Sequence, residues 1–189
     1  MSLEHFCEWL GDTPGSQALH SSSYGYPLVE SVHVWALCFF LGMTIVLDLR
    51  LVGWTLRQVP ISQITKRLFP WMIGGFVVMV VSGGLLFYAI PLRTYQSIFF
   101  RAKLILLVLA GLNAWVFHTT IWKRLAEWDV DRPVPPKARF AGAASLILWT
   151  LIVIAGRLIA YNWFDCDRQP QPAAVNFLAS CPPDSGTSE

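Results

Sequence analysis

Charged residues are scarce in this sequence of 189 residues. They make up only 14% of the chain, whereas a soluble domain usually has about 25%. A soluble protein of this size would carry charges along every helix, so their scarcity excludes an ordinary soluble fold. The net charge is only +2, and no Lys/Arg-rich run alternates with aromatic residues, which argues against nucleic acid as a partner.

Several familiar motifs are absent as well. The sequence has no Ser/His/Asp spacing, Gly-rich phosphate loop, CxxC, CxxCH or HExxH motif, so it does not say whether the chain is an enzyme. Residues 1–26 contain no Lys or Arg, whereas a secretory signal places a basic region before a short apolar one. We therefore expect the first apolar run to be kept as a membrane helix.

Long apolar runs are what the sequence has in abundance. A helix needs about 20 apolar residues to cross about 30 Å of hydrocarbon, and four segments qualify: 27–47, 71–90, 99–122 and 140–161. The sequence predicts an all-α fold, an integral membrane bundle of four transmembrane helices over residues 27–161. Residues 1–26 and 162–189 flank it, with short amphipathic interfacial segments at 5–10 and 173–178 and a disordered end after residue 181.

Basic residues indicate the orientation. Two predicted loops, one after the first helix and one after the third, hold nine of the fourteen Lys and Arg residues: Arg50, Arg57, Lys66, Arg67, Lys123, Arg124, Arg132, Lys137 and Arg139. Because loops rich in Lys and Arg stay in the cytoplasm, we expect both termini outside. Three cysteines then lie outside, where a disulfide persists. Cys166–Cys181 is the favoured pair and Cys7–Cys166 the alternative, while Cys38 packs inside the first helix.

Ionisable residues within the predicted spans are the candidate site. Glu30 and His33 share one helix face, and Arg157 lies at a similar outer depth. Arg101 and Lys103 begin the third helix at that level, and His20 precedes the first. His118 lies near the cytoplasmic boundary, about 15 Å deeper than His33, so one haem cannot join the two.

Three interpretations of this outer cluster stay open. In the first, Glu30 and Arg157 form a structural ion pair. In the second, His33 is an axial ligand of haem b with His20 or a Met opposite, and Arg157 with Arg101 or Lys103 binds the propionates. In the third, Glu30, His33 and His20 form a copper or other metal site, or a quinone site.

Two features nearer the cytoplasm have simpler interpretations. His118 is an interface residue, or a ligand of a second haem together with Met43 or Met72. Asp48 and Arg50 are expected to pair with loop charges.

The chain from about residue 6 to residue 181 resembles a family of uncharacterised bacterial four-helix membrane proteins, labelled as a domain of unknown function. The motifs that carry the resemblance are PLVESVH at 27–33, LDLRLVG at 47–53, PW at 70–71, FFRAK at 99–103 and GR at 156–157. The resemblance implies an inner-membrane four-helix protein. Together with the orientation expected from the basic loops, this makes both termini periplasmic. In helix count it is similar to CopD-type and cytochrome b561-type bundles, although the matched histidine pairs of the latter are missing.

From these features we expect a small redox-associated membrane protein, either a cytochrome b-like or a quinone-interacting electron-transfer subunit. The alternative is a non-enzymatic structural or copper-handling component of a larger complex. Lipid is the expected surrounding, and a second copy or a membrane or periplasmic redox protein is the expected partner.

Overall fold

Four long helices dominate the computed structural model, which describes residues 3–123, 128–129, 134–161, 166 and 170–181. They are α3 (Gly25–Val52), α4 (Ile61–Ala89), α6 (Ile98–Val116) and α7 (Pro136–Ile159), and α6 continues into a π-helix, η1 (Phe117–Ile121). All four are long and apolar enough to cross a membrane. The described residues contain no strand, so the predicted all-α membrane bundle is confirmed.

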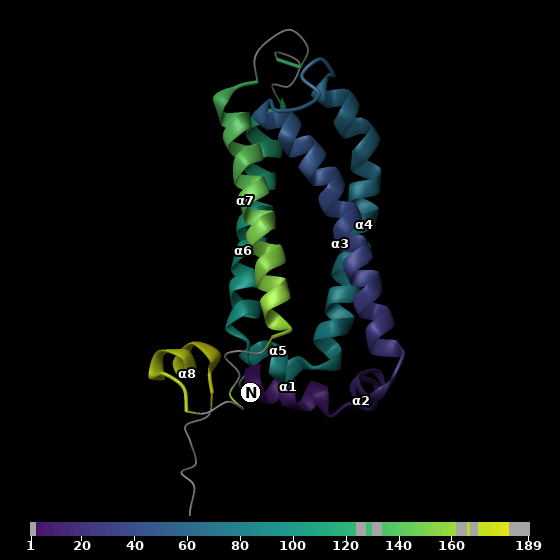
Figure 1. The fold of residues 1–189 in the computed structure, drawn as a ribbon, viewed down its shortest axis with the longest axis vertical. Helices are drawn as coiled ribbons and strands as arrows, with labels where there is room; N and C mark the ends of the chain where they lie inside the picture. The colour runs from purple at the N-terminus through teal and green to yellow at the C-terminus, as the bar shows by residue number, and fades with distance from the viewer. Residues whose placement is uncertain (1–2, 124–127, 130–133, 162–165, 167–169, 182–189) are drawn as a thin grey trace, which may run out of the picture.

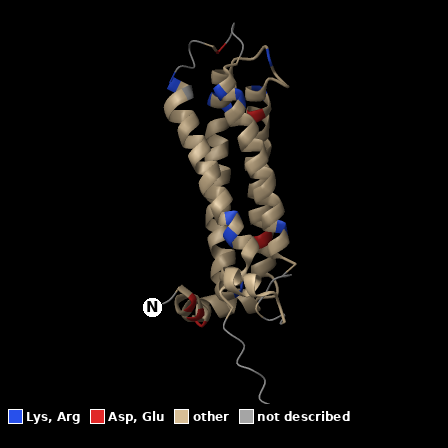
Figure 2. Ribbon diagram, turned by 90° about the vertical axis from the view of Figure 1, so that its left-hand side faces the viewer, with Lys and Arg blue, Asp and Glu red and all other residues tan. Residues whose placement is uncertain are grey.

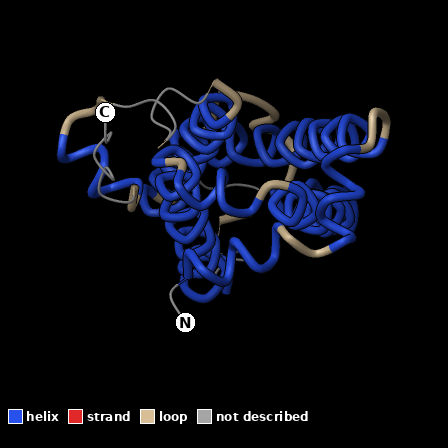
Figure 3. The backbone as a smooth tube through the Cα atoms, turned by 90° about the horizontal axis from the view of Figure 1, so that it is seen from below, coloured by secondary structure: helices blue, strands red, loops and turns tan. Residues whose placement is uncertain are grey.

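The four helices form two pairs joined along one side. α3 packs mainly on α4, α6 packs on α7, and α3 also packs on α7. Figures 1 and 3 show the α3/α4 pair beside the α6/α7 pair. α4 and α6 have little close backbone contact, so the ring of helices is not closed between them.

Short helices cover one end of the bundle. They are α1 (Leu3–Gly11), α2 (Pro14–Ser21), α5 (Pro91–Gln96) and α8 (Ala173–Ala179), and Figure 1 places them at the same end. We call this the terminal end. Lys and Arg residues gather at the opposite end, which we call the basic end, whereas acidic residues mark α1 (Figure 2).

Aromatic packing fills the middle of the bundle where α3 meets its neighbours. The Phe40 ring lies 4.9 Å from the Trp149 ring of α7 and 5.6 Å from the Phe76 ring of α4. Gly142 lets α7 approach α3 closely, because a Cβ there would lie 2.9 Å from Leu51 Cβ and 3.0 Å from the Asp48 carbonyl oxygen. Inside lipid, such close van der Waals packing is a main source of helix association.

The basic end is closed by a separate cluster, which also explains why the second helix is longer than the apolar span at 71–90. The second helix begins at Ile61 rather than at 71, and Pro70 lies inside it. Ile61 is fully buried against Leu51 and Trp128, so tertiary packing extends the helix beyond the proline. Asp129 caps the new start, since its carboxylate accepts from the backbone N–H and the hydroxyl of Ser62.

At the terminal end, the predicted amphipathic segments form α1 and α8, and the additional helix α2 was not anticipated. Cys166 and Cys181 form a disulfide, which confirms the favoured pairing, while Cys7 and Cys38 are free. The predicted disorder after residue 181 lies outside the described residues.

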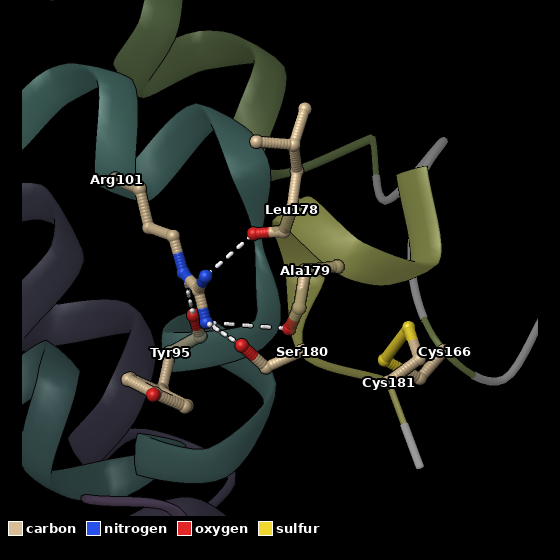
Figure 4. The surroundings of a disulfide bond; sticks show 7 residues. All are labelled: Tyr95, Arg101, Cys166, Leu178, Ala179, Ser180 and Cys181. Atoms are coloured by element: carbon tan, nitrogen blue, oxygen red, sulfur yellow. Dashed lines mark hydrogen bonds between the residues drawn. A yellow bond between two sulfur atoms is a disulfide. The ribbon is translucent and has the colours of Figure 1, made fainter. Parts of the chain in front are cut away.

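Arg101 attaches α8 to the bundle (Figure 4). Its guanidinium donates to the Leu178 and Ala179 carbonyl oxygens and to Ser180 Oγ, and it also donates to the Tyr95 carbonyl oxygen at 3.1 Å. The carbonyls at a helix C-terminus have no partner within the helix, so Arg101 caps α8.

Candidate functional site

A cavity of about 1860 Å³ lies between the two helix pairs. Its lining extends from Tyr26 and Arg93 at the terminal end to Lys66 and Trp122 at the basic end. Residues of both α4 and α6 line it, along the side where these two helices do not pack closely. Phe87 of α4 stacks on Phe100 of α6 with ring centroids 5.6 Å apart, and this stack joins the two helices near the terminal end.

The middle of the cavity is apolar. Its walls there include Phe40, Phe76, Met79, Leu107 and Trp149, which come from all four long helices. Apolar walls with a few polar groups at defined positions are typical of sites for small organic ligands. The cavity can therefore accommodate a long apolar group, and its specificity must come from its two ends.

His33 provides the most defined polar group at the terminal end. Its Nδ1 lies 3.0 Å from Ser82 Oγ, and the Ser82 hydroxyl lies 2.6 Å from the Val78 carbonyl oxygen. A hydroxyl has one proton, so when Ser82 donates to that carbonyl it accepts from His33 Nδ1–H. Neutral His33 then carries its lone pair on Nε2. Gly83 leaves room for the ring, since a Cβ there would lie 3.1 Å from His33 Cε1.

Charged groups from four other positions line the same end. Lys103 of α6 and Glu30 of α3 are within electrostatic range of His33, and Arg93 and Arg157 also line the cavity. Lys103 Nζ lies 3.2 Å from the position that a Cβ on Gly156 would occupy, so glycine makes space for it. Three cations face one carboxylate here, which favours a ligand with acceptor oxygens.

The predicted ion pair between Glu30 and Arg157 is not formed, although both residues line the cavity with His33. Arg157 instead donates to Tyr161 Oη at 3.2 Å and lies 5.1 Å from the centroid of that ring. Arg157 and Tyr161 are spaced i,i+4 across the end of α7, which places both side chains on the same side of the helix and within reach of each other.

Three further candidates lie apart from this cluster. Arg101 does not line the cavity and binds α8. His20 does not line it either, and its ring meets Tyr26 edge to face at 6.5 Å. His118 lines the basic end and stacks on Trp122 at 6.3 Å, which agrees with its expected separation from His33.

The predicted metal site of Glu30, His33 and His20 is not assembled, since no group of three or more His, Cys, Asp or Glu side chains suited to a metal occurs in the described ranges. Sequence reasoning also missed Ser82 and the position of Asp48 in the cavity wall. The Asp48 side chain lines the cavity, while Arg50 donates to the Val59 and Arg57 carbonyl oxygens. Residues two apart on a helix point in different directions, so the spacing of Asp48 and Arg50 could have shown that they do not share the same surroundings.

The chain belongs to a family of unknown function, DUF6644, whose sequence profile matches residues 7–162. The expected resemblance to an uncharacterised family is thereby confirmed. Comparison with curated proteins and with solved structures finds no significant match.

Proposed function

We propose that this member of DUF6644 is a redox-associated membrane protein that binds a lipophilic quinone in the cavity between its helix pairs. The observation that carries the proposal is the combination of His33 and Lys103 at one end of a long apolar cavity. A quinone has the matching shape, with a polar ring and an apolar tail.

The chemistry of the two side chains fits both redox states of such a ring. An ammonium group has three donors and no acceptor, so Lys103 would donate to a quinone carbonyl oxygen. His33 Nε2 is an acceptor in the tautomer that Ser82 favours, so it would accept from the hydroxyl of a quinol. As the quinol is oxidised, the same nitrogen can take up the hydroxyl proton as a general base.

Access to the cavity also suits a lipid-soluble ligand. The side between α4 and α6 is not closed by helix packing over most of its length, and both helices expose large apolar side chains. A quinone dissolved in the bilayer would enter there without crossing an aqueous phase. The Phe87–Phe100 stack would hold its ring end within the bundle.

Haem b is the second candidate, and the orientation of His33 favours it. Haem-ligating histidines usually donate one ring N–H to a neighbour, which leaves the other nitrogen for iron, and Ser82 fixes His33 in this way. Met79 or Met72, which also line the cavity, would supply the second ligand, because His20 lies outside the lining. Lys103 and Arg157 would bind the propionates.

The charge distribution supports a bacterial inner-membrane location with the basic end in the cytoplasm. Loops rich in Lys and Arg stay on that side, and Figure 2 shows many of the Lys and Arg residues at the basic end. Both termini would then be periplasmic, where the Cys166–Cys181 disulfide is stable. An electron-transfer subunit also needs a redox partner, either a second copy or another membrane or periplasmic protein.

Quinone binding to the detergent-purified protein tests the proposal. Decylubiquinone is titrated into the full chain and its affinity measured by calorimetry, for the wild type and for His33→Ala and Lys103→Met. Losing one hydrogen bond to a buried acceptor costs about 1–3 kcal/mol, so each variant should bind roughly 5- to 100-fold more weakly. His118→Ala and His20→Ala are matched controls. The first removes a histidine side chain at the far end of the cavity, and the second removes one outside the cavity.

The same preparation separates the alternatives. A Soret band that is lost in His33→Ala and kept in His118→Ala would show that the ligand at His33 is haem b and not a quinone. A colourless protein with no quinone affinity would contradict both and leave a structural or copper-handling role. Equal weakening by His20→Ala and His33→Ala would show that the quinone binds elsewhere.

A further inference from the structure

A second polar site lies at the basic end of the cavity, around Asp48. Asp48 is four residues from the end of α3, and about 22 Å along the helix from His33 at 1.5 Å per residue. It is only 5% exposed, yet it lines the cavity. Ser145 of α7 forms a hydrogen bond with its carboxyl group, while Oδ2 is buried without a hydrogen-bond partner.

The described residues place no cation beside this carboxyl group. Within the described part of the chain, no Lys, Arg or His lies within ion-pair distance of Asp48. Arg50, on the same helix, is engaged by backbone carbonyls. Among the described residues, the other titratable groups that line this end of the cavity are Lys66 of α4 and His118 of η1. From α7, Ala141 and Ser145 line it here, and only Ser145 has a polar side chain.

An ionised carboxylate accepts at about four lone-pair positions and donates at none. With a single hydroxyl as partner, a buried Asp48 carboxylate would be largely unsatisfied, and an unpaired buried charge is far more expensive than a neutral polar group. A neutral carboxylic acid needs only one acceptor for its own proton. The geometry therefore favours the protonated form while the basic end of the cavity is dry.

Thr65 shows that this end has further unused hydrogen-bonding capacity. It lies four residues from the start of α4, at about the same depth as Asp48. Its Oγ1 is also buried without a partner, and it lines the same cavity. Two unsatisfied oxygens from adjacent helices thus border one space, where the acid proton can be passed to a hydrogen-bonding group or to water.

We propose that Asp48 is a proton-binding site of the cavity. It holds a proton as a neutral carboxylic acid at pH 7 and releases it towards the basic end, where the O–H bond breaks, the electron pair stays on the carboxylate and the proton passes to water. This site is separate from the quinone site at His33 and does not depend on it. Together they give the cavity one protonatable group near each end.

Infrared spectroscopy of the full chain in detergent tests this directly. A protonated carboxyl group has a C=O stretching band that shifts in D₂O and that a carboxylate lacks. The wild type should show such a band at pH 7, and Asp48→Asn should lose it. Glu30→Gln is the matched control, because Glu30 is an exposed carboxyl at the other end, and it should leave the band unchanged. Ser145→Ala should shift the band by removing its hydrogen bond.

Two results would overturn the proposal. One is the absence of this band from the wild-type protein at pH 7. This measurement does not depend on whether any variant folds. The other is a melting temperature that is higher in Na⁺ than in K⁺ for the wild type and equal in the two salts for Asp48→Asn. Such a difference would mean that Asp48 is ionised and binds a metal cation. A neutral acid predicts instead that Asp48→Asn, which replaces one neutral group by another of the same shape, melts within a few degrees of the wild type.

Discussion

Replacing Arg101 should release α8 from the bundle. The guanidinium makes three hydrogen bonds to this segment, through the Leu178 and Ala179 carbonyl oxygens and Ser180 Oγ. Buried charge-assisted bonds are worth about 1.5–3 kcal/mol each, but this group is half-exposed, so we take about 1 kcal/mol each. Arg101→Gln should then weaken docking by about 3 kcal/mol, which is roughly 100-fold in the undocked fraction.

Hydrogen exchange of the amides in residues 173–181 measures this docking. Arg101→Gln should speed exchange throughout α8 while the four long helices keep their protection, and Arg101→Lys should lie between, because an ammonium cannot reach the three acceptors as a planar fork does. Arg67→Gln removes a guanidinium at the basic end and serves as the control. Unchanged protection of α8 in Arg101→Gln would refute the assignment of Arg101 as the group that holds it.

Three further predictions concern packing, thiol chemistry and topology. Gly142→Ala should destabilise the bundle by about 1–3 kcal/mol through overpacking against α3. In the control Gly74→Ala the new Cβ meets nothing within 4 Å, so its melting temperature should be unchanged or slightly higher. Equal melting temperatures of the two variants would contradict the close approach of α7 to α3. Burial and the Glu4 carboxylate raise the pKa of the Cys7 thiol, so peptide mapping should find that Cys7 is alkylated slowly at pH 7 and faster as the pH rises. Alkylation of Cys7 at pH 7 as fast as in the unfolded protein would contradict the raised pKa. A reporter that is active only in the cytoplasm should be active when fused at Gln58. Activity at Gln58 of a reporter that works only after export would show that the orientation is the reverse of the proposed one.

The sequence predicted the parts of the fold that depend on composition over long windows. Four apolar runs were enough to identify four membrane helices, and the short separation of Cys166 from Cys181 favoured the disulfide that forms. The helix α4 begins at Ile61, ten residues before the predicted apolar span at 71–90, and Pro70 lies inside it. Burial of Ile61 against residues distant in the chain decides that boundary, and no local pattern reports it.

The candidate site was predicted only in part. His33, Glu30, Arg157 and Lys103 do line one cavity, as their similar depth suggested. Arg101 was placed with them, although it lies two positions from Lys103 and so points in a different direction on the same helix. Depth along a helix can be counted from the sequence, but the direction of each side chain depends on how the two helix pairs meet.

Photoaffinity labelling tests whether a quinone binds in the cavity between the helix pairs. A short-chain quinone with a photoreactive group on its tail is irradiated with the full chain, and the labelled peptides are mapped by mass spectrometry. We expect labels on wall residues such as Phe76 and Leu107. Excess unlabelled quinone should prevent this labelling, and His33→Ala should reduce it. Labels confined to outward-facing residues such as Val77 and Ile105, insensitive to competing quinone, would contradict it.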